Sequence, residues 1–140
     1  MLIAEIAQYL QSKGLGVFDP DGVSGNIYLE YCPDSPDAVI YITASGGPAP
    51  DAKHPIDKPT VQMIIRGGLN PAEAQQKAQD IYNALHAFHH KQFVSDGRWI
   101  VGCWAMQGGP VHMGVDDLRR HEYSLNFQLE IVNNTVNRNW

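Results

Sequence analysis

Three histidines near the middle of the sequence are the residues best suited to bind a metal. His86 and His90 are four positions apart, a spacing that would place two imidazoles on one face of a helix. A helical metalloprotease site also needs Glu directly after the first His, and Ala87 stands there. Histidines at the end of a helix, His89 included, are equally explained by the negative end of the helix dipole. A metal enzyme at this site would need further ligands from His112, His121 or Cys103.

Motifs typical of hydrolases and nucleotide-binding proteins are incomplete. Residues 22–26 place Ser24 as in a nucleophile elbow but lack the second glycine at the required position. Residues 14–19 lack the third glycine of a dinucleotide fingerprint, and Gly-Lys-Ser/Thr does not occur. These gaps disfavour a hydrolase and a nucleotide-binding fold, and the incomplete histidine cluster predicts that no metal is needed.

Acidic pairs occur in two segments rich in turn-forming residues. Asp34 and Asp37 lie in the first, and residues 116–120, Asp-Asp-Leu-Arg-Arg, form the second. Asp commonly stabilises turns because its side chain forms hydrogen bonds with the nearby backbone, and exposed ion pairs contribute little free energy to stability. Arginine and tryptophan are nevertheless enriched in protein interfaces. The predicted interface residues are Asp116, Asp117, Arg119, Arg120 and Trp140.

Composition indicates a folded globular chain and disfavours non-specific binding to polyanions. The 140 residues are 44% hydrophobic and 18% charged, with a net charge of −5. The basic residues are scattered, which disfavours binding to nucleic acid or to an anionic membrane. No apolar run is long enough to span a membrane. Cys32 and Cys103 lie in apolar, strand-like runs and are predicted to be buried free thiols.

The amino-terminal half predicts one helix and three strands. Apolar residues recur at helical spacing from Leu2 to Leu10, and Gly14 ends the helix. Residues 26–31 and 38–44 are rich in β-formers and predict a hairpin. Residues 46–59 are dense in Gly and Pro and predict a surface loop. Residues 61–66 alternate as in a strand with one buried face.

A second helix has a clear start signal. Asn70 is placed to accept the amide of residue 73, Pro71 suits the first helical position, and Glu73 completes a capping box. The apolar stripe predicts a helix that runs to about His89, with Leu85 buried. Two other residues of this helix, Gln79 and Asn83, are predicted to be exposed.

The remaining residues predict strands and loops. Residues 93–94 and 99–106 flank Asp96-Gly97, which indicates a tight hairpin. Within it, Trp99 and Trp104 should face opposite sides, so that one is in the core. Residues 108–120 predict a glycine-rich loop, and residues 123–131 alternate as in a half-buried strand.

These elements predict an α+β fold: a single, mainly antiparallel or mixed β-sheet with two α-helices packed on it. One domain is expected over residues 1–132. The segment 133–140 is too polar to order itself and is predicted to be a flexible tail.

Several short signatures, taken in order, resemble the minor capsid or tail-terminator proteins of long-tailed phages. After the amphipathic amino-terminal helix they are Ile27-Tyr28-Leu29-Glu30-Tyr31, Pro33-Asp34-Ser35-Pro36-Asp37, Gly46-Gly47-Pro48, a strand ending near Arg66, and Ala78-x-x-Ile81-Tyr82-x-x-Leu85-His86. Two more follow: Gln107-x-x-Pro110-x-x-x-Gly114-x-Asp116-Asp117 and Arg120-x-Glu122-Tyr123-x-x-Asn126-Phe127. His89-His90 and the carboxyl-terminal extension fall outside this pattern.

The resemblance implies a structural virion protein of the tail or neck that is not an enzyme, has no cofactor and is assembled in the host bacterial cytoplasm. Tail terminators form a hexameric ring at the head-proximal end of the tail tube, stop tube polymerisation and provide the head-tail joining surface. The implied partners are further copies of the chain, the tail tube protein and the head-tail connector protein. DNA would pass through the lumen without specific binding. The alternatives are a neck or head-completion protein on the head side of the connector, or a small metal-dependent enzyme using His86 and His90.

Overall fold

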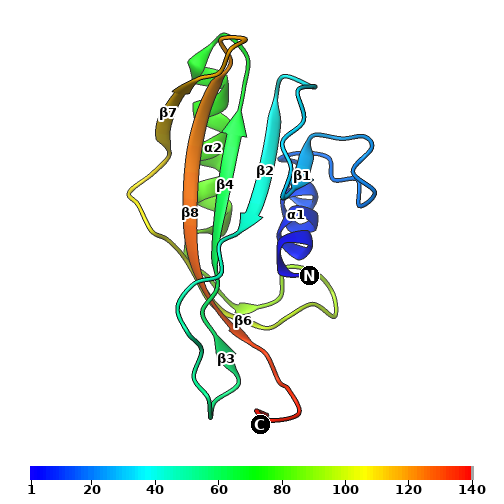
Figure 1. The fold of residues 1–140 in the computed structure, drawn as a ribbon, viewed down its shortest axis with the longest axis vertical. Coiled ribbons are helices and arrows are strands. Elements are labelled where there is room, and N and C mark those ends of the chain that lie inside the picture. Colours follow the sequence, from blue (N-terminus) through cyan, green and yellow to red (C-terminus); the bar gives the residue numbers. More distant parts are fainter. Residues whose placement is uncertain (140) are drawn as a thin grey trace.

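The structure, a computed structural model, describes residues 1–139 as two helices and one eight-stranded mixed sheet (Figure 1). Its elements in chain order are α1 (Leu2–Ser12), β1 (Ile27–Leu29), β2 (Val39–Ala44), β3 (Ile56–Asp57), β4 (Thr60–Arg66), α2 (Pro71–Leu85), β5 (Phe88–Lys91), β6 (Ile100–Ala105), β7 (Val111–Val115) and β8 (His121–Val132). Within the described residues, no helix is long and apolar enough to cross a membrane. The predicted α+β class is confirmed.

The long strand β8 organises the sheet, which runs β1-β2-β4-β8-β6-β5. It pairs antiparallel with β4 over residues 122–128, with β7 near its start and with β6 toward its end. Its side chains alternate as predicted, with Leu125, Phe127 and Leu129 buried. β8 therefore pairs with β7 near its start and with the short strand β3 at its other end, and these define the β7 end and the β3 end of the sheet.

The prediction that residues 26–31 and 38–44 form an antiparallel hairpin is wrong. The strands β1 and β2 pair parallel, with Ile27 beside Ile40. The turn-rich segment between them does not fold back tightly but returns to the starting end, where two arginines from distant parts of the chain hold it. Local turn signals cannot reveal bonds to residues so far along the chain.

The second helix begins as predicted and ends earlier. Asn70 accepts the Ala72 amide at 3.0 Å, rather than the amide of residue 73, and Pro71 is the first helical residue. The helix stops at Leu85 instead of His89, because Ala87 adopts a positive φ of 65° and Phe88 turns into the core. From Phe88 the chain continues as β5, which pairs with β6.

Two further strand predictions need correction. The partner of β6 is residues 88–91 rather than 93–94, so Asp96-Gly97 lies in a longer loop. The predicted loop 108–120 contains β7, a strand whose side chains are almost all exposed and which therefore shows no buried periodicity. Trp99 precedes β6 and is 44% exposed, while Trp104 lies over Gly102 and is 40% exposed. Neither tryptophan is in the core.

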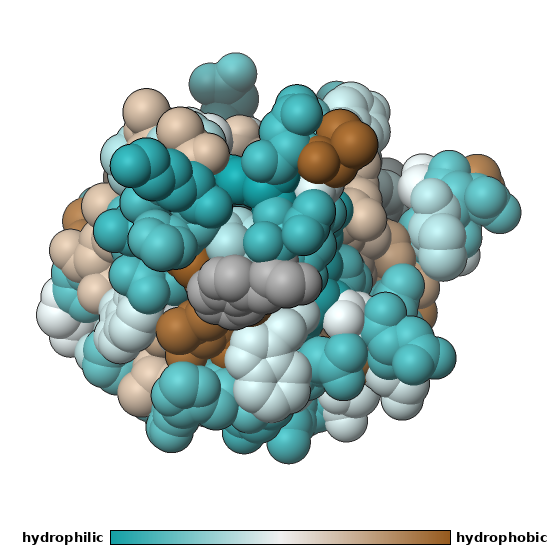
Figure 2. Space-filling view, turned by 90° about the horizontal axis from the view of Figure 1, so that it is seen from below, coloured by the Kyte–Doolittle hydropathy of each residue, from teal (hydrophilic) through white to brown (hydrophobic). Residues whose placement is uncertain are grey.

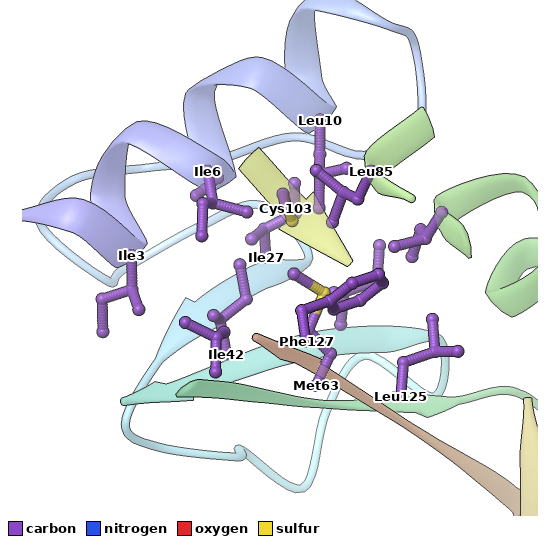
Figure 3. Close-up of a cluster of buried hydrophobic side chains, with 14 of the residues drawn as sticks. Ile3, Ile6, Leu10, Ile27, Ile42, Met63, Leu85, Cys103, Leu125 and Phe127 are labelled. Atoms are coloured by element: carbon purple, nitrogen blue, oxygen red, sulfur yellow. The ribbon is translucent and has the colours of Figure 1, made fainter. Parts of the chain in front are cut away.

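The core lies between the sheet and the two helices (Figure 3). Ile6 and Leu10 of α1 and Leu85 of α2 are fully buried, which confirms the predicted helix faces. Asn83 is exposed as predicted, whereas Gln79 is half-buried. Cys103 is a buried free thiol, and burial raises its pKa to about 12.

Candidate interaction site

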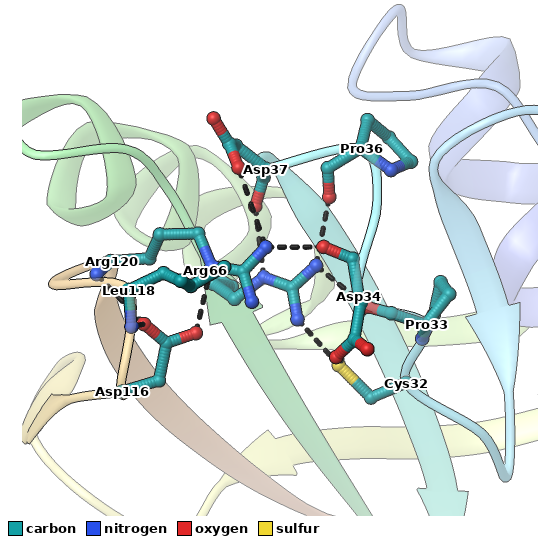
Figure 4. A network of polar contacts seen from close by, with 9 residues as sticks. All are labelled: Cys32, Pro33, Asp34, Pro36, Asp37, Arg66, Asp116, Leu118 and Arg120. Atoms are coloured by element: carbon teal, nitrogen blue, oxygen red, sulfur yellow. Dashed lines mark hydrogen bonds and ion pairs between the residues drawn. The ribbon is translucent and has the colours of Figure 1, made fainter.

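Two arginines lie close together on the open face of the sheet, where they hold the segment 32–37 (Figure 4). Arg66 is the last residue of β4, and Arg120 immediately precedes β8. Both residues are only 5% exposed. Charged side chains are seldom buried unless their hydrogen-bonding groups are satisfied, so the partners of these two define the site.

Backbone carbonyls surround Arg66. Its Nε donates to the Asp37 carbonyl at 2.9 Å, and its Nη2 donates to the carbonyls of Pro33 at 2.7 Å and Pro36 at 2.8 Å. Its Nη1 lies 3.3 Å from Sγ of Cys32, which sits in this segment, half-buried, and not in a strand as predicted. The planar guanidinium can serve so many acceptors at once because its five donors are fixed in a fork.

Arg120 joins the same segment to the turn that precedes β8. Its Nε donates to Asp116 at 2.7 Å, and Nη1 reaches the Asp37 carboxylate at 3.3 Å and the Asp34 carbonyl. Asp116 also accepts the amides of Leu118 and Arg120. Burial acts to raise the pKa of Asp116, but these bonds outweigh it and hold the pKa below its ordinary value.

The predicted interface residues therefore separate into two groups. Asp116 and Arg120 bind each other in a local turn and ion pair, which was the alternative to an interface. Asp117 and Arg119 are exposed. Trp140 lies outside the described residues. Contact of these residues with another protein remains a prediction.

An exposed apolar row on β7 was missed by the sequence analysis. Val111, Met113 and Val115 are 50%, 53% and 55% exposed, and Met106 and Leu118 beside the strand are exposed as well. Within residues 1–139, β7 has a strand partner on one edge only, β8. An apolar row on an open sheet edge is typical of a surface that another chain covers. Its alternation was the available signal, but two glycines and a proline just before it favoured a loop.

The opposite end of the molecule is polar and includes residues 133–139. Asn133 and Arg138 donate to the two carboxylate oxygens of Asp57, each at 2.7 Å. Arg138 also donates to the Asp51 carbonyl at 2.9 Å. Figure 2 shows this end, where hydrophilic side chains predominate and hydrophobic ones form small patches. The predicted mobility of residues 133–140 remains a prediction.

The histidine cluster does not have the predicted geometry. His86 follows the last residue of α2, where its Nδ1 accepts the Ala105 amide at 3.0 Å and its ring stacks on Tyr82. His90 belongs to β5, so the two histidines do not share a helix face. Among residues 1–139, no three His, Cys, Asp or Glu side chains are grouped to hold a metal ion.

Comparisons with known proteins identify a family and a similar fold. Residues 9–133 match the family described as bacteriophage tail terminator protein. No curated protein matches the chain. A similar fold occurs in a solved structure titled "Virion of native gene transfer agent (GTA) particle", with a TM-score of 0.59, 17% identity and 93% of each chain covered.

The structural likeness concerns the fold alone, because identity is low. The family match shows membership in a protein family and not only a shared fold, since it spans most of the chain, from within α1 to just after β8. The protein accordingly belongs to the bacteriophage tail terminator family and is a structural component of the virion tail.

Proposed function

We propose that this protein closes the head-proximal end of the tail tube as a ring of six subunits. The ring stops polymerisation of the tube protein and offers a joining surface to the head-tail connector. Assembly takes place in the cytoplasm of the host bacterium. The observation that carries the proposal is the family match over residues 9–133.

Ring closure needs two different faces of each subunit to meet, because identical faces would pair subunits as dimers. The apolar row of β7 supplies one such face, with Asp117 and Arg119 near its end. Asp116 and Arg120 shape this region from within, since they fix the turn between β7 and β8. Trp140 adds a further contact with a neighbouring subunit or ring.

The ring also gives DNA a passage without a specific binding site. The net charge of −5 repels the phosphate backbone, which suits a lumen that must release DNA at ejection.

Electron microscopy of assembled tails tests the position and number of subunits. We expect six copies at the head-proximal end of each tube. Their presence only at the distal tip would overturn the assignment. A copy found on heads that lack tails would instead favour the alternative of a neck protein on the head side of the connector.

A charge placed on β7 tests the subunit interface. Met113→Asp should prevent ring formation and lengthen the tubes, because a desolvated carboxylate would lie in the interface. Val23→Asp is the matched control, since Val23 is 82% exposed on a loop far from β7. Normal rings from the Met113 variant would exclude β7 from the interface.

The metal-enzyme alternative makes a different prediction. His86→Gln combined with His90→Gln should leave tail assembly intact if the protein is structural. Loss of function in this double variant together with loss of a bound metal would support the enzyme instead.

A further inference from the structure

Two histidines outside the central cluster face each other across β7 and β8. Nε2 of His112 lies 3.0 Å from Nδ1 of His121, and the ring centroids are 5.3 Å apart. They are not direct partners in the sheet, because His112 stands opposite Tyr123 and His121 stands opposite Val115. They are instead diagonal neighbours, a position from which aromatic side chains can reach each other.

A bulge in β7 shapes the backbone next to His112. The register shifts between His112 and Gly114, and Gly114 has a φ of 118°, which favours glycine. Bulges commonly redirect a side chain next to a functional site. The ring of Tyr123 packs edge-on against His112 at 5.1 Å, which supports the orientation of the His112 ring.

His121 is held by its backbone. Its amide donates to the Gly68 carbonyl at 3.2 Å, and its carbonyl accepts the Gly67 amide at 2.9 Å. These bonds tie the start of β8 to the chain between β4 and α2. The two imidazoles are thus positioned by separate, well-anchored strands, as a binding site requires.

The distance between the two nitrogens suits a shared metal ion. Imidazole nitrogens bind Zn²⁺ at about 2.0–2.1 Å, so two of them are about 2.9 Å apart at an octahedral angle and about 3.4 Å apart at a tetrahedral angle, and the observed 3.0 Å lies within this range. His112 is exposed and His121 half-buried, which leaves the pair open to an ion from solution. Neutral imidazole is a preferred ligand of zinc, copper and nickel.

We propose that His112 and His121 chelate one divalent transition-metal ion between β7 and β8, with water in its remaining positions. Without the ion, the N–H of one facing nitrogen donates a hydrogen bond to the facing nitrogen of the other ring. When the ion binds, that proton moves to the outer nitrogen of the same ring, and both facing lone pairs bind the metal. The protein stays at constant charge, and no other reactant is needed.

The other histidines lack this geometry and serve as controls. Nδ1 of His86 is occupied by the Ala105 amide. His89 and His90 are sequence neighbours whose rings are nearly perpendicular, at 83°, and Nδ1 of His89 lies 2.6 Å from the Ala87 carbonyl. Replacing this second pair therefore removes two histidines without touching the proposed site.

Calorimetric titration of the full-length protein, without a histidine tag, with Zn²⁺ and with Ni²⁺ tests the proposal. We expect one ion per chain, and loss of this binding in His112→Gln and in His121→Gln. The double variant His89→Gln with His90→Gln should bind like the unchanged protein. Circular dichroism checks that each variant is folded.

Absence of binding by the unchanged protein would overturn the proposal, and so would full binding by either single variant. Cu²⁺ spin resonance of the unchanged protein gives an independent measurement, which needs no variant. Coordination by two imidazole nitrogens is expected, and a single nitrogen would contradict the site. None of these readouts depends on ring formation, so the terminator proposal stands or falls separately.

Discussion

At each end of the sheet, arginine hydrogen bonds hold a segment of irregular structure in place, but the two segments differ in what depends on them. At the β7 end, Arg66 and Arg120 hold the internal segment 32–37, which connects the parallel strands β1 and β2. At the β3 end, Arg138 holds the segment after β8 against Asp57. An arginine that secures an internal connection stabilises the whole fold, whereas one that secures a terminal segment stabilises that segment alone.

The largest expected effect comes from removing Arg66. Arg66→Met would leave the carbonyls of Pro33, Pro36 and Asp37 without their donors and should lower the free energy of unfolding by about 3 kcal/mol. Urea denaturation measures this. Arg138→Met is the matched variant at the other end and should cost less, because only the terminal residues 133–139 depend on this arginine and they can open locally. Equal losses would remove the distinction between the ends.

Acid should separate Arg138 from Arg66 by the kind of acceptor that each arginine uses. The pKa of Asp57 is lowered, because hydrogen bonds from Asn133 and Arg138 outweigh the effect of burial. Its contribution to stability is complete above the ordinary value of 3.8 and disappears as the pH falls through the lower folded value. The carbonyl partners of Arg66 do not titrate.

Amide NMR spectra recorded from pH 6 to pH 3 test this difference. The amide resonances of residues 133–139 should shift toward the values of an unfolded chain. Those of the segment 32–37, whose carbonyls accept from Arg66, should stay in place. Asp57→Asn is the control and should release residues 133–139 already at pH 6. Simultaneous loss of both regions would show that they are coupled.

Deleting residues 133–140 should have a small effect on the subunit. We expect nearly unchanged circular dichroism and a loss of stability within about 1 kcal/mol, because few apolar side chains leave the core. Ring formation or head-tail joining should decrease. Full-length Trp140→Ala separates the tryptophan from the rest of the segment. Equal yields of infectious particles from truncated and intact protein would exclude a role for the segment.

Thiol labelling gives the smallest effect, a difference in rate. Cys103 is buried with a pKa of about 12, so it should react only when the chain unfolds. Cys32 is half-buried, and burial also raises its pKa, but opening of the segment 32–37 exposes it. Cys32 should therefore react first, and faster in Arg66→Met. Equal native-state rates for the two thiols would contradict this order.

Prediction succeeded where the deciding interactions are local. The periodicity of α1, the Asn70-Pro71 start of α2 and the alternation of β8 each report which side chains face the core. It failed at the end of α2, because the apolar stripe continues to Phe88 although that residue enters the core from a strand. The candidate site was named in part: Asp116 and Arg120 were singled out, but Arg66 was not.

By itself, the sequence determined the fold class, the helix faces and the charge that disfavours polyanions, because each follows from the order and type of neighbouring residues. Only the tertiary structure decided the parallel pairing of β1 with β2, the buried partners of Arg66 and the meeting of His112 with His121. Arg66 and its carbonyl partners are about thirty positions apart in the chain, and the two histidines depend on the shifted register of β7. Hydrogen bonds act over about 3 Å, so which groups form them depends on distances that only the folded chain establishes.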